Sequence, residues 1–529
     1  MTSGSATRIA GAAAVITVLT VISRIAGFGR TLVFLQTVGA GPLGDIYNAA
    51  NTIPNIVFEL VAGGALASLV VPLLAAHVVA GDRDRVNAVA SALLTWVLTL
   101  LVPLAVLVAL LAGPISSLLP GVPDEHREVA ASMLRVFAPQ LPLYGIGIVL
   151  TGVLQAHHRF AWPVLAPLLS SVTVMGAYLT YASVDGARTD FGGLSGTGER
   201  VLSVGTTLGV VVLALCLVIP LRRLRLRLRP RYAFPGGEGR QAVRLGWAGA
   251  VTVGSQQVVL AVAVLVAVGG GLVAYNAAQT VFLLPWAVLA VPLATAVYPT
   301  LSAADLDGYR AALAPAARST VLLAGLGAAA LAALAEPIAE LIGAGGAAPG
   351  IAGFAAGLFG YALFALLSRA LYARGWTVAA AAGTAAGWGV AAVTAVVLSV
   401  TLGDDRQVLA LALANALGMS VIGLLLVRSV RRHAGAAALA GLGRAAAAGI
   451  VAAVVAALAG WATVTGAGHL SGGTVRSLLQ GVLGGLAVLV AYAAVAFAVD
   501  APDARRLGAL VRRRRPRALQ RRPERKEET

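Results

Sequence analysis

Charged residues are scarce in this chain of 529 residues, where Asp, Glu, Lys and Arg make up 12% of the sequence. Soluble domains contain about 25% of these residues, so the composition excludes an ordinary soluble protein. Hydrophobic residues account for 59% of the chain, and the mean hydropathy is +0.87. We therefore predict an all-α polytopic membrane protein.

Cysteine and metal-ligand patterns are also nearly absent. Cys216 is the single cysteine, which excludes a disulfide within the chain. The six histidines match no Cys/His spacing and no His-Glu-x-x-His pattern of a metal site. We therefore predict no metal and no cofactor.

Long apolar stretches recur throughout the sequence. A spanning helix needs about 20 apolar residues, and we count fourteen such stretches between charged or Gly/Pro-rich breaks. Several exceed the minimum length, which predicts tilted or kinked helices. The predicted spans are 9–36, 46–77, 87–112, 129–154, 162–183, 201–220, 242–266, 272–302, 312–343, 350–373, 377–401, 407–428, 445–465 and 477–499.

Arginine is concentrated in two segments, the connector at 221–244 and the tail from 501, each with a net charge of +7. Basic loops mark the cytoplasmic side of a membrane protein. An even number of spans separates the two segments, so both termini are predicted to be cytoplasmic. The tail has no aromatic residue for base stacking, which favours contact with anionic lipid headgroups over nucleic-acid binding.

An internal echo divides the chain into two halves. Residues 65–76 are echoed at 292–303, and 150–156 more weakly at 367–373. These pairs fall on helices two and eight and on helices four and ten, so helices 1–6 correspond to helices 7–12. Because six is even, the two lobes are related by a pseudo-two-fold axis along the membrane normal. Two such lobes with a site between them describe an alternating-access transporter.

The predicted organisation therefore has five parts. They are an N-lobe at 1–222, a basic cytoplasmic connector at 223–241, a C-lobe at 242–430, two extra helices at 431–500 and a basic cytoplasmic tail at 501–529.

Two arginines, Arg24 and Arg30, lie inside the first predicted span. A cation there costs roughly 2.5–3.5 kcal/mol, and such residues usually face a polar cavity on a transport path. The guanidinium offers a planar fork of donors that suits phosphate oxygens. The two side chains are about 240° apart on a regular helix, and a bend at Gly27 and Gly29 would turn both toward one cavity.

Acidic residues near these arginines have two interpretations. Glu59 lies among apolar residues, where it either binds a proton during transport or serves as a counter-ion for Arg24 or Arg30. An arginine that pairs with Asp45 or Glu59, or reaches the interface, would be tolerated for structural reasons alone. The sequence leaves both alternatives open.

Neutral polar residues occur on the seventh and eighth predicted helices. Gln256 and Gln257 lie on the seventh, and Asn276 and Gln279 on the eighth. They either line a polar cavity that contacts sugar or peptide, or bond between membrane helices, which is the interpretation we favour.

The first two predicted helices contain a distinctive series of motifs, with looser motifs in both lobes. They are Ser23–Arg30, Gly39–Pro42, Asp45, Pro54–Asn55, Gly64–Ala65 and Val71–Pro72, followed by Arg159–Pro167 and Ala287–Pro299. Together they resemble the MurJ (MviN) family of lipid II flippases, within the multidrug/oligosaccharidyl-lipid/polysaccharide exporter superfamily.

The resemblance implies a transporter of the bacterial plasma membrane rather than an enzyme. Its substrate would be a polyprenyl-pyrophosphate-linked peptidoglycan precursor, moved from the inner to the outer leaflet. Fourteen helices are implied, with the last two forming a groove for the lipid tail. Arg24 and Arg30 match cavity arginines of the family, and Asp45 matches an acid at the outer end of helix two. Asn55, in the Pro-Asn motif, and Glu59 complete the implied substrate-binding set.

The sequence departs from the family at three places. Phe58 and Thr280 stand where the family commonly has arginines. Spans 242–266 and 377–401 have no acid or asparagine for the sodium site found in part of the family, so membrane potential or protons are the expected energy source. These departures leave two alternatives open: an exporter of another lipid-linked saccharide or amphipathic drug, and a non-transporting scaffold that recruits cell-wall synthesis proteins.

Overall fold

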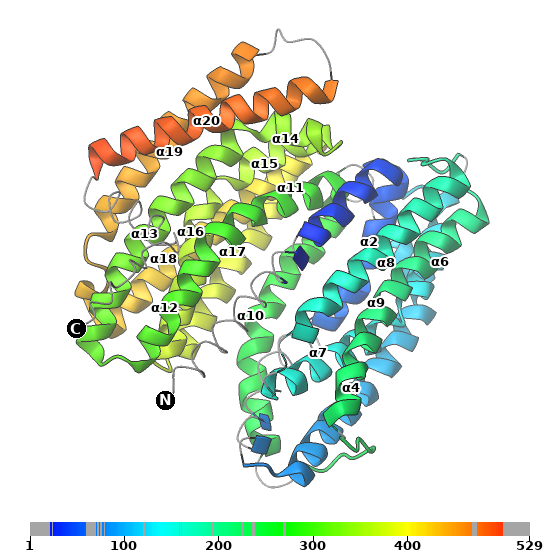
Figure 1. Cartoon of the computed structure of the whole chain (residues 1–529). Helices are drawn as coiled ribbons and strands as arrows, with labels where there is room; N and C mark the ends of the chain where they lie inside the picture. The colour runs from blue at the N-terminus through cyan, green and yellow to red at the C-terminus, as the bar shows by residue number, and fades with distance from the viewer. Residues whose placement is uncertain are drawn as a thin grey trace, which may run out of the picture.

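A computed structural model shows the fold of the chain (Figure 1). The residues it describes are 19, 22–23, 25–59, 70, 73–74, 77–78, 80–119, 122–157, 159, 161–192, 194–224, 226–234, 238–267, 271–467 and 473–500. All regular secondary structure in this part of the chain is helical, which confirms the predicted all-α class.

The helices of the first half pack as one bundle. After a helix over 25–37, they are α2 (Pro42–Phe58), α4 (Arg83–Leu110), α5 (Ala112–Ser117), η2 (Asp124–His126), α6 (Arg127–Phe137), α7 (Gln140–Ala156), α8 (Ala161–Asp185) and α9 (Gly196–Leu224).

The second half begins with α10, which lies between the two bundles and contacts both α2 and α17 (Figure 1). Its helices are α10 (Glu238–Ala267), α11 (Leu272–Pro285), η3 (Trp286–Ala290), α12 (Val291–Ala303), α13 (Leu306–Ala333), α14 (Ala335–Leu341), η4 (Gly345–Ala347), α15 (Ala348–Phe354), α16 (Gly357–Ala373), α17 (Thr377–Leu402), η5 (Asp404–Arg406), α18 (Gln407–Ala434), η6 (Ala436–Leu439), α19 (Leu442–Gly466) and α20 (Gly473–Val499).

The described part of the chain has eleven helices that are long and apolar enough to cross a membrane, or twelve if the bent pair α15 and α16 is one span. They overlap the last twelve predicted spans. The first two predicted spans, 9–36 and 46–77, extend over many residues outside the described ones. The tail at 501–529 also lies outside them.

The predicted kinks are confirmed, and the structure locates them. The span predicted at 312–343 is divided between α13 and α14, which meet at Leu334. The span predicted at 272–302 contains the π-helical segment η3, which follows Pro285. Helices α15 and α16 meet at an angle of 58°. Proline removes a backbone donor and commonly accompanies such irregularities.

The two bundles have the same order of breaks. In the first, α4 is followed by the short α5, the turn η2 and the divided pair α6 and α7. In the second, α13 is followed by the short α14, the turn η4 and the divided pair α15 and α16. The last member of each pair, α7 or α16, has 17 residues.

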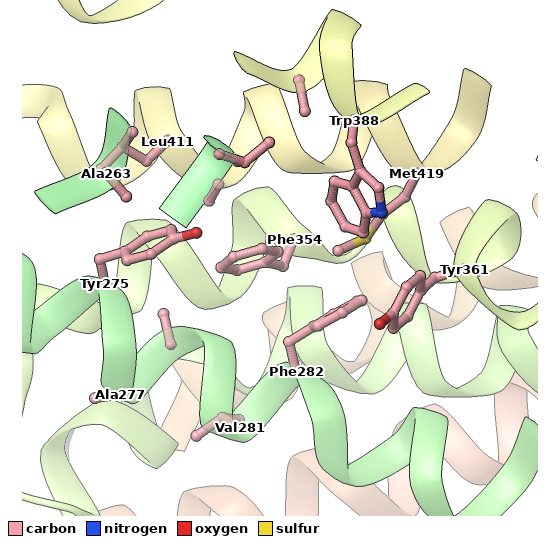
Figure 2. Close-up of a cluster of buried hydrophobic side chains, with 14 of the residues drawn as sticks. Ala263, Tyr275, Ala277, Val281, Phe282, Phe354, Tyr361, Trp388, Leu411 and Met419 are labelled. Atoms are coloured by element: carbon pink, nitrogen blue, oxygen red, sulfur yellow. The ribbon is translucent and has the colours of Figure 1, made fainter. Parts of the chain in front are cut away.

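Aromatic side chains fill the core of the second bundle where its helices are broken (Figure 2). Phe282 stacks on Phe354 with ring centroids 5.0 Å apart, and Tyr361 contacts Phe282, Trp286 and Trp388. The indole nitrogen of Trp286 donates a hydrogen bond of 3.1 Å to the Tyr361 carbonyl. These large buried rings hold η3 against α16 and α17.

Helices α19 and α20 pack on the second bundle. The Tyr492 hydroxyl in α20 donates to the Leu322 carbonyl in α13 at 2.5 Å. At one end of α20, Ser477 donates to Glu340 at 2.7 Å. Glu340 lies in α14, beyond the spanning helix α13. The hydrogen bond from Ser477, together with the nearby Arg476, lowers the pKa of the Glu340 carboxyl group. The other end of α20 is held by an ion pair of 3.1 Å between Arg444 and Asp500.

Helices α16 and α18 approach closely because both have glycine at their contact. A Cβ atom at Gly360 would lie 2.1 Å from the Met419 carbonyl oxygen, and one at Gly423 would lie 2.8 Å from the Gly360 Cα. Small residues allow this backbone contact in membrane helices.

We predict that Gly360→Ala lowers the free energy of unfolding by about 1–3 kcal/mol, since the added methyl group forces the two backbones apart. Thermal unfolding of the purified protein in detergent would show a lower Tm. Gly389→Ala is the matched control, because a Cβ atom there meets nothing within 4 Å. Equal Tm values for the two variants would contradict the close contact.

Candidate functional site

Asp45 joins the two bundles. Its carboxylate is 3% exposed and accepts hydrogen bonds from the backbone N–H groups of Gly271 at 3.1 Å and Val273 at 2.8 Å. These groups belong to the first turn of α11, where backbone donors lack partners within their own helix. The helix dipole also favours a negative charge there. We call this contact between α2 and α11 the Asp45 cap.

Local sequence explains how Asp45 reaches the other bundle. Gly39 has a positive φ of 80° and ends the first helix, and Pro42 occupies the first turn of α2. Gly44 allows the close approach, because a Cβ atom there would lie 2.3 Å from the Gly39 carbonyl oxygen and 3.2 Å from Val273. The Gly-Ala-Gly-Pro motif therefore places Asp45 against α11.

A pocket of about 480 Å³ lies beside the Asp45 cap. Residues 40–42 and Asp45 line it from the first bundle, and Gly346, Asp405 and Arg406 are among those that line it from the second. This pocket belongs to the seam between the two bundles.

Arg30 is exposed, and its charge lies within electrostatic range of the hydroxyl groups of Tyr47, Tyr144 and Tyr178. The interpretation that Asp45 neutralises Arg30 is wrong, since the Asp45 carboxylate is bonded to α11. Within the described ranges, no ion pair joins Arg30 to an acid. Its guanidinium is therefore available to an anionic ligand. Arg24 lies outside the described residues.

Three tyrosines near Arg30 were missed by sequence reasoning. The Tyr47 hydroxyl in α2 lies 2.9 Å from the Tyr178 hydroxyl in α8 and 2.5 Å from Thr206 Oγ1 in α9. Tyr144 in α7 also lies within range of the Glu59 charge. The sequence feature that could have identified these tyrosines is a phenol group within an otherwise apolar span. The structure thus brings Arg30 and Glu59 to the same group of helices.

Helix α2 has a continuous polar face. Asn48, Asn51, Thr52, Asn55 and Glu59 follow helical spacing and are all partly exposed. The Asn51 Oδ1 atom is buried and has no hydrogen-bond partner among the described residues. Asn55 and Glu59, both predicted site residues, therefore share one face with two amides and a hydroxyl that sequence reasoning missed.

Helix α11 has a matching polar face. Asn276, Gln279 and Thr280 share one side and are partly exposed, whereas Tyr275 and Phe282 point into the core of the second bundle (Figure 2). The Thr280 hydroxyl donates to the Asn276 carbonyl at 2.8 Å. Since α2 and α11 both begin at the Asp45 cap, their polar residues lie at similar distances from this contact along the two helices.

The glutamines of α10 have different environments. Gln256 is exposed, whereas Gln257 is 9% exposed and its buried Oε1 atom has no partner within the described ranges. Neither glutamine side chain is bonded to another helix among the described residues, so bonding between helices stays a prediction for both.

Phe58 points away from this site. It is 2% exposed, and its ring centroid lies 5.5 Å from that of Tyr144. The position where the family commonly has an arginine is therefore part of an apolar core in this chain. Within the described residues, no group of three or more His, Cys, Asp or Glu side chains could hold a metal ion.

Two packed helical bundles, with eleven or twelve described helices long and apolar enough to cross a membrane, define a polytopic membrane protein. Among solved structures, the fold is similar to a lipid II flippase MurJ in an inward closed conformation, with a TM-score of 0.69 and 17% identity over 91% of this chain and 98% of that one. It is also similar to an inward-facing multidrug transporter of the MATE family within the MOP superfamily, with a TM-score of 0.61 and 16% identity over 80% and 98% of the two chains.

The family model described as lipid II flippase MurJ matches residues 34–480, and the chain therefore belongs to the MurJ family of lipid flippases, which are transporters and not enzymes. The resemblance identified in the sequence is confirmed.

Two curated relatives show how far the similarity extends. A probable lipid II flippase MurJ of Synechocystis is 30% identical over 44% of this chain and 44% of its own length. A lipid II flippase MurJ of Burkholderia cenocepacia is 26% identical over 67% of this chain and 71% of its own length. The chain thus spans less than half of the first relative and about 71% of the second.

We predict that Asp45→Ala separates the bundles at the cap, because each lost hydrogen bond to a charged group is worth about 1.5–3 kcal/mol. Spin labels at Ala40→Cys and Gly345→Cys, two exposed positions in different bundles, would report a longer distance in a larger fraction of molecules.

Asp404→Ala is the matched control, since Asp404 is exposed and bonds only to Gln407 among its described neighbours. Identical distance distributions for Asp45→Ala and this control would show that the cap does not hold the bundles together.

Proposed function

We propose that this chain is a flippase that moves lipid II, a polyprenyl-pyrophosphate-linked peptidoglycan precursor, from the inner to the outer leaflet by alternating access. Membership of the MurJ family supports the substrate class. The observation that carries the proposal is the exposed Arg30 guanidinium, whose charge acts on the Tyr144 hydroxyl together with that of Glu59. An arginine fork with no ion-pair partner among the described residues of a membrane protein suits a pyrophosphate group.

The proposed architecture has fourteen helices, with two six-helix lobes related by a pseudo-two-fold axis. The matching order of α4 to α7 and α13 to α16 supports this duplication. Helices α19 and α20 would guide the lipid tail, since they lie on the outside of the second bundle (Figure 1).

The protein would lie in a bacterial plasma membrane with both termini cytoplasmic. The basic connector and tail support this orientation. The first turns of α2 and α11 then lie at the outer surface, so the Asp45 cap closes the outer side. Substrate would enter from the cytoplasmic leaflet while the cap is intact.

Each predicted site residue has a proposed role. Arg30, together with Arg24, would bind the pyrophosphate, and Glu59 would bind a proton or balance an arginine. The amides of Asn55, Asn276 and Gln279 would contact the saccharide or peptide. Transfer to the outer leaflet would require the Asp45 cap to break. Binding of the substrate would therefore have to stabilise the outward-open state by a free energy similar to that of the hydrogen bonds lost in the cap.

We infer the energy source by excluding sodium. The predicted spans at 242–266 and 377–401 have no acid or asparagine for sodium, so membrane potential or protons would drive transport. The proposed partners are the anionic lipid-linked substrate, membrane lipids and cell-wall synthesis proteins, with no nucleic acid and no cofactor.

A second candidate is an exporter of another lipid-linked saccharide or an amphipathic drug. The buried Phe58 and the internally bonded Thr280 favour it, because both stand where the family commonly has a cation. A scaffold that recruits cell-wall proteins is the third alternative, and it would need no transport.

We predict that Arg30→Ala reduces the appearance of lipid II in the outer leaflet at least about tenfold, equivalent to about 1.4 kcal/mol of lost interaction. The assay would use cells depleted of their own flippase, with all variants at equal expression. Arg30→Lys should retain part of the activity, because lysine keeps the charge but not the donor fork.

Arg135→Ala is the control, since Arg135 is exposed and paired with Glu128 at 2.8 Å. Full activity of Arg30→Ala would exclude Arg30 as the anion site. Absence of rescue by the wild-type chain would favour the other substrates or the scaffold.

We also predict that replacing sodium with choline leaves lipid II transport unchanged, because the sodium-binding residues are missing from the sequence. Collapse of the membrane potential and proton gradient in the same cells should stop transport. A rate that falls in choline and recovers with sodium would contradict the proposed energy source.

A further inference from the structure

The connector between the two bundles runs along α4 as an extended segment. The backbone N–H groups of residues 227, 229 and 231 donate to Asn87 Oδ1 at 3.1 Å, Ser91 Oγ at 3.1 Å and Thr95 Oγ1 at 2.9 Å. The three acceptors are spaced four residues apart on α4, which is a rise of about 6 Å per step. Alternate residues of an extended chain advance about 6.6 Å, so the two repeats match.

The sequence of the segment suits this arrangement. Pro230 has no N–H group, but it lies between two of the donating residues. Its presence therefore removes none of the three hydrogen bonds to α4. Leu226 and Leu228 are partly buried and pack against the apolar clusters of the first bundle. Alternate residues point to opposite sides of an extended chain. The leucines therefore face the protein, and the arginines between and beyond them face outward.

Arg227, Arg229 and Arg231 form an exposed row along this edge. Within the described ranges, none of the three is joined to an acidic side chain by an ion pair, and the single side-chain bond of the row goes from Arg231 to the Ala233 carbonyl at 3.0 Å. The row thus presents three guanidinium groups on a backbone that is fixed in place, with the Cα atoms of successive arginines about 6.6 Å apart.

An aromatic pair locates the row relative to the membrane. The Trp96 indole donates to the Tyr232 carbonyl at 2.9 Å, and their ring centroids lie 5.4 Å apart. The side chains are 51% and 56% exposed, and the adjacent Leu100 of α4 is 50% exposed. Tryptophan and tyrosine favour the membrane–water interface. The arginine row therefore lies at headgroup level next to a lipid-facing helix.

We propose that Arg227, Arg229 and Arg231 form a binding site for anionic phospholipid headgroups of the cytoplasmic leaflet. The side of the membrane rests on the orientation in the proposed function, whereas the binding itself does not. Each arginine near an anionic surface contributes attraction, and a fixed backbone lowers the entropy lost when the headgroups bind. The site would hold the first bundle in an anionic leaflet while the second bundle moves.

Native mass spectrometry of the purified full-length protein tests this binding. Phosphatidylglycerol would be titrated against the wild type and an R227Q/R229Q/R231Q variant, with phosphatidylcholine as the neutral lipid. The variant should bind phosphatidylglycerol at least about tenfold more weakly. R428Q/R431Q/R432Q is the matched control, since it removes the same charge from the end of α18, and it should bind as the wild type does.

A second variant, N87A/S91A/T95A, keeps the arginines and removes the acceptors on α4. It should weaken phosphatidylglycerol binding by a smaller factor, which a purely electrostatic attraction would not predict. Thermal unfolding would confirm that each variant is folded.

Three outcomes would overturn the proposal: equal binding by the R227Q/R229Q/R231Q variant and the wild type, equal losses in the α18 control, or equal affinity for phosphatidylcholine. Displacement of phosphatidylglycerol by inorganic pyrophosphate at the same concentration would assign the row to phosphate groups in general. Labelling of Ala233→Cys from outside the cell by an impermeant thiol reagent would overturn the cytoplasmic placement. That result would reject the proposed orientation without affecting the lipid titration.

Discussion

The Asp45 cap is the interaction on which the arrangement of the two bundles depends. One buried carboxylate accepts two backbone N–H groups from a helix that lies 226 to 228 residues further along the chain. The cap satisfies donors that α11 cannot satisfy itself, and its loss leaves them without partners in a closely packed seam. Such a contact is either made or broken, which gives the seam between the bundles two discrete states.

Both apolar and polar groups lie where the two bundles meet. Within each bundle, contacts are made by apolar and aromatic groups, such as Phe282 on Phe354, which lose stability when parted. Between the bundles, Leu43 and Ile46 of α2 belong to one buried apolar cluster with Leu272 and Val273 of α11. Both helices also carry partly exposed amides and hydroxyl groups, which either water or substrate can satisfy. In the proposed alternating-access mechanism, each bundle stays packed and the contact between the bundles opens. In that mechanism, the exposed Arg30 would lie on the transport route.

Hydropathy was sufficient to predict the helical fold, the positions of the described spans and the presence of kinks, because a bilayer constrains length and polarity strongly. The partner of Asp45 could not be predicted, since a backbone N–H group has no sequence signature. The polar face of α2 could be predicted only in part. Asn48 and Asn51 are assigned to it only when the contacts of Asp45 and Tyr47 show which side of the helix is buried. The arginines of the connector were evident, but their fixed spacing depends on Asn87, Ser91 and Thr95, which are ordinary polar residues in an apolar spanning helix.

The most direct test of alternating access at this seam is transport by a protein that is locked at the cap. Ala40→Cys and Gly345→Cys would be joined by a short cleavable thiol crosslinker, in a Cys216→Ala background, and lipid II transport would be measured in reconstituted vesicles. We predict that crosslinked protein does not transport lipid II and that cleavage of the linker restores transport. Undiminished transport by fully crosslinked protein would contradict it.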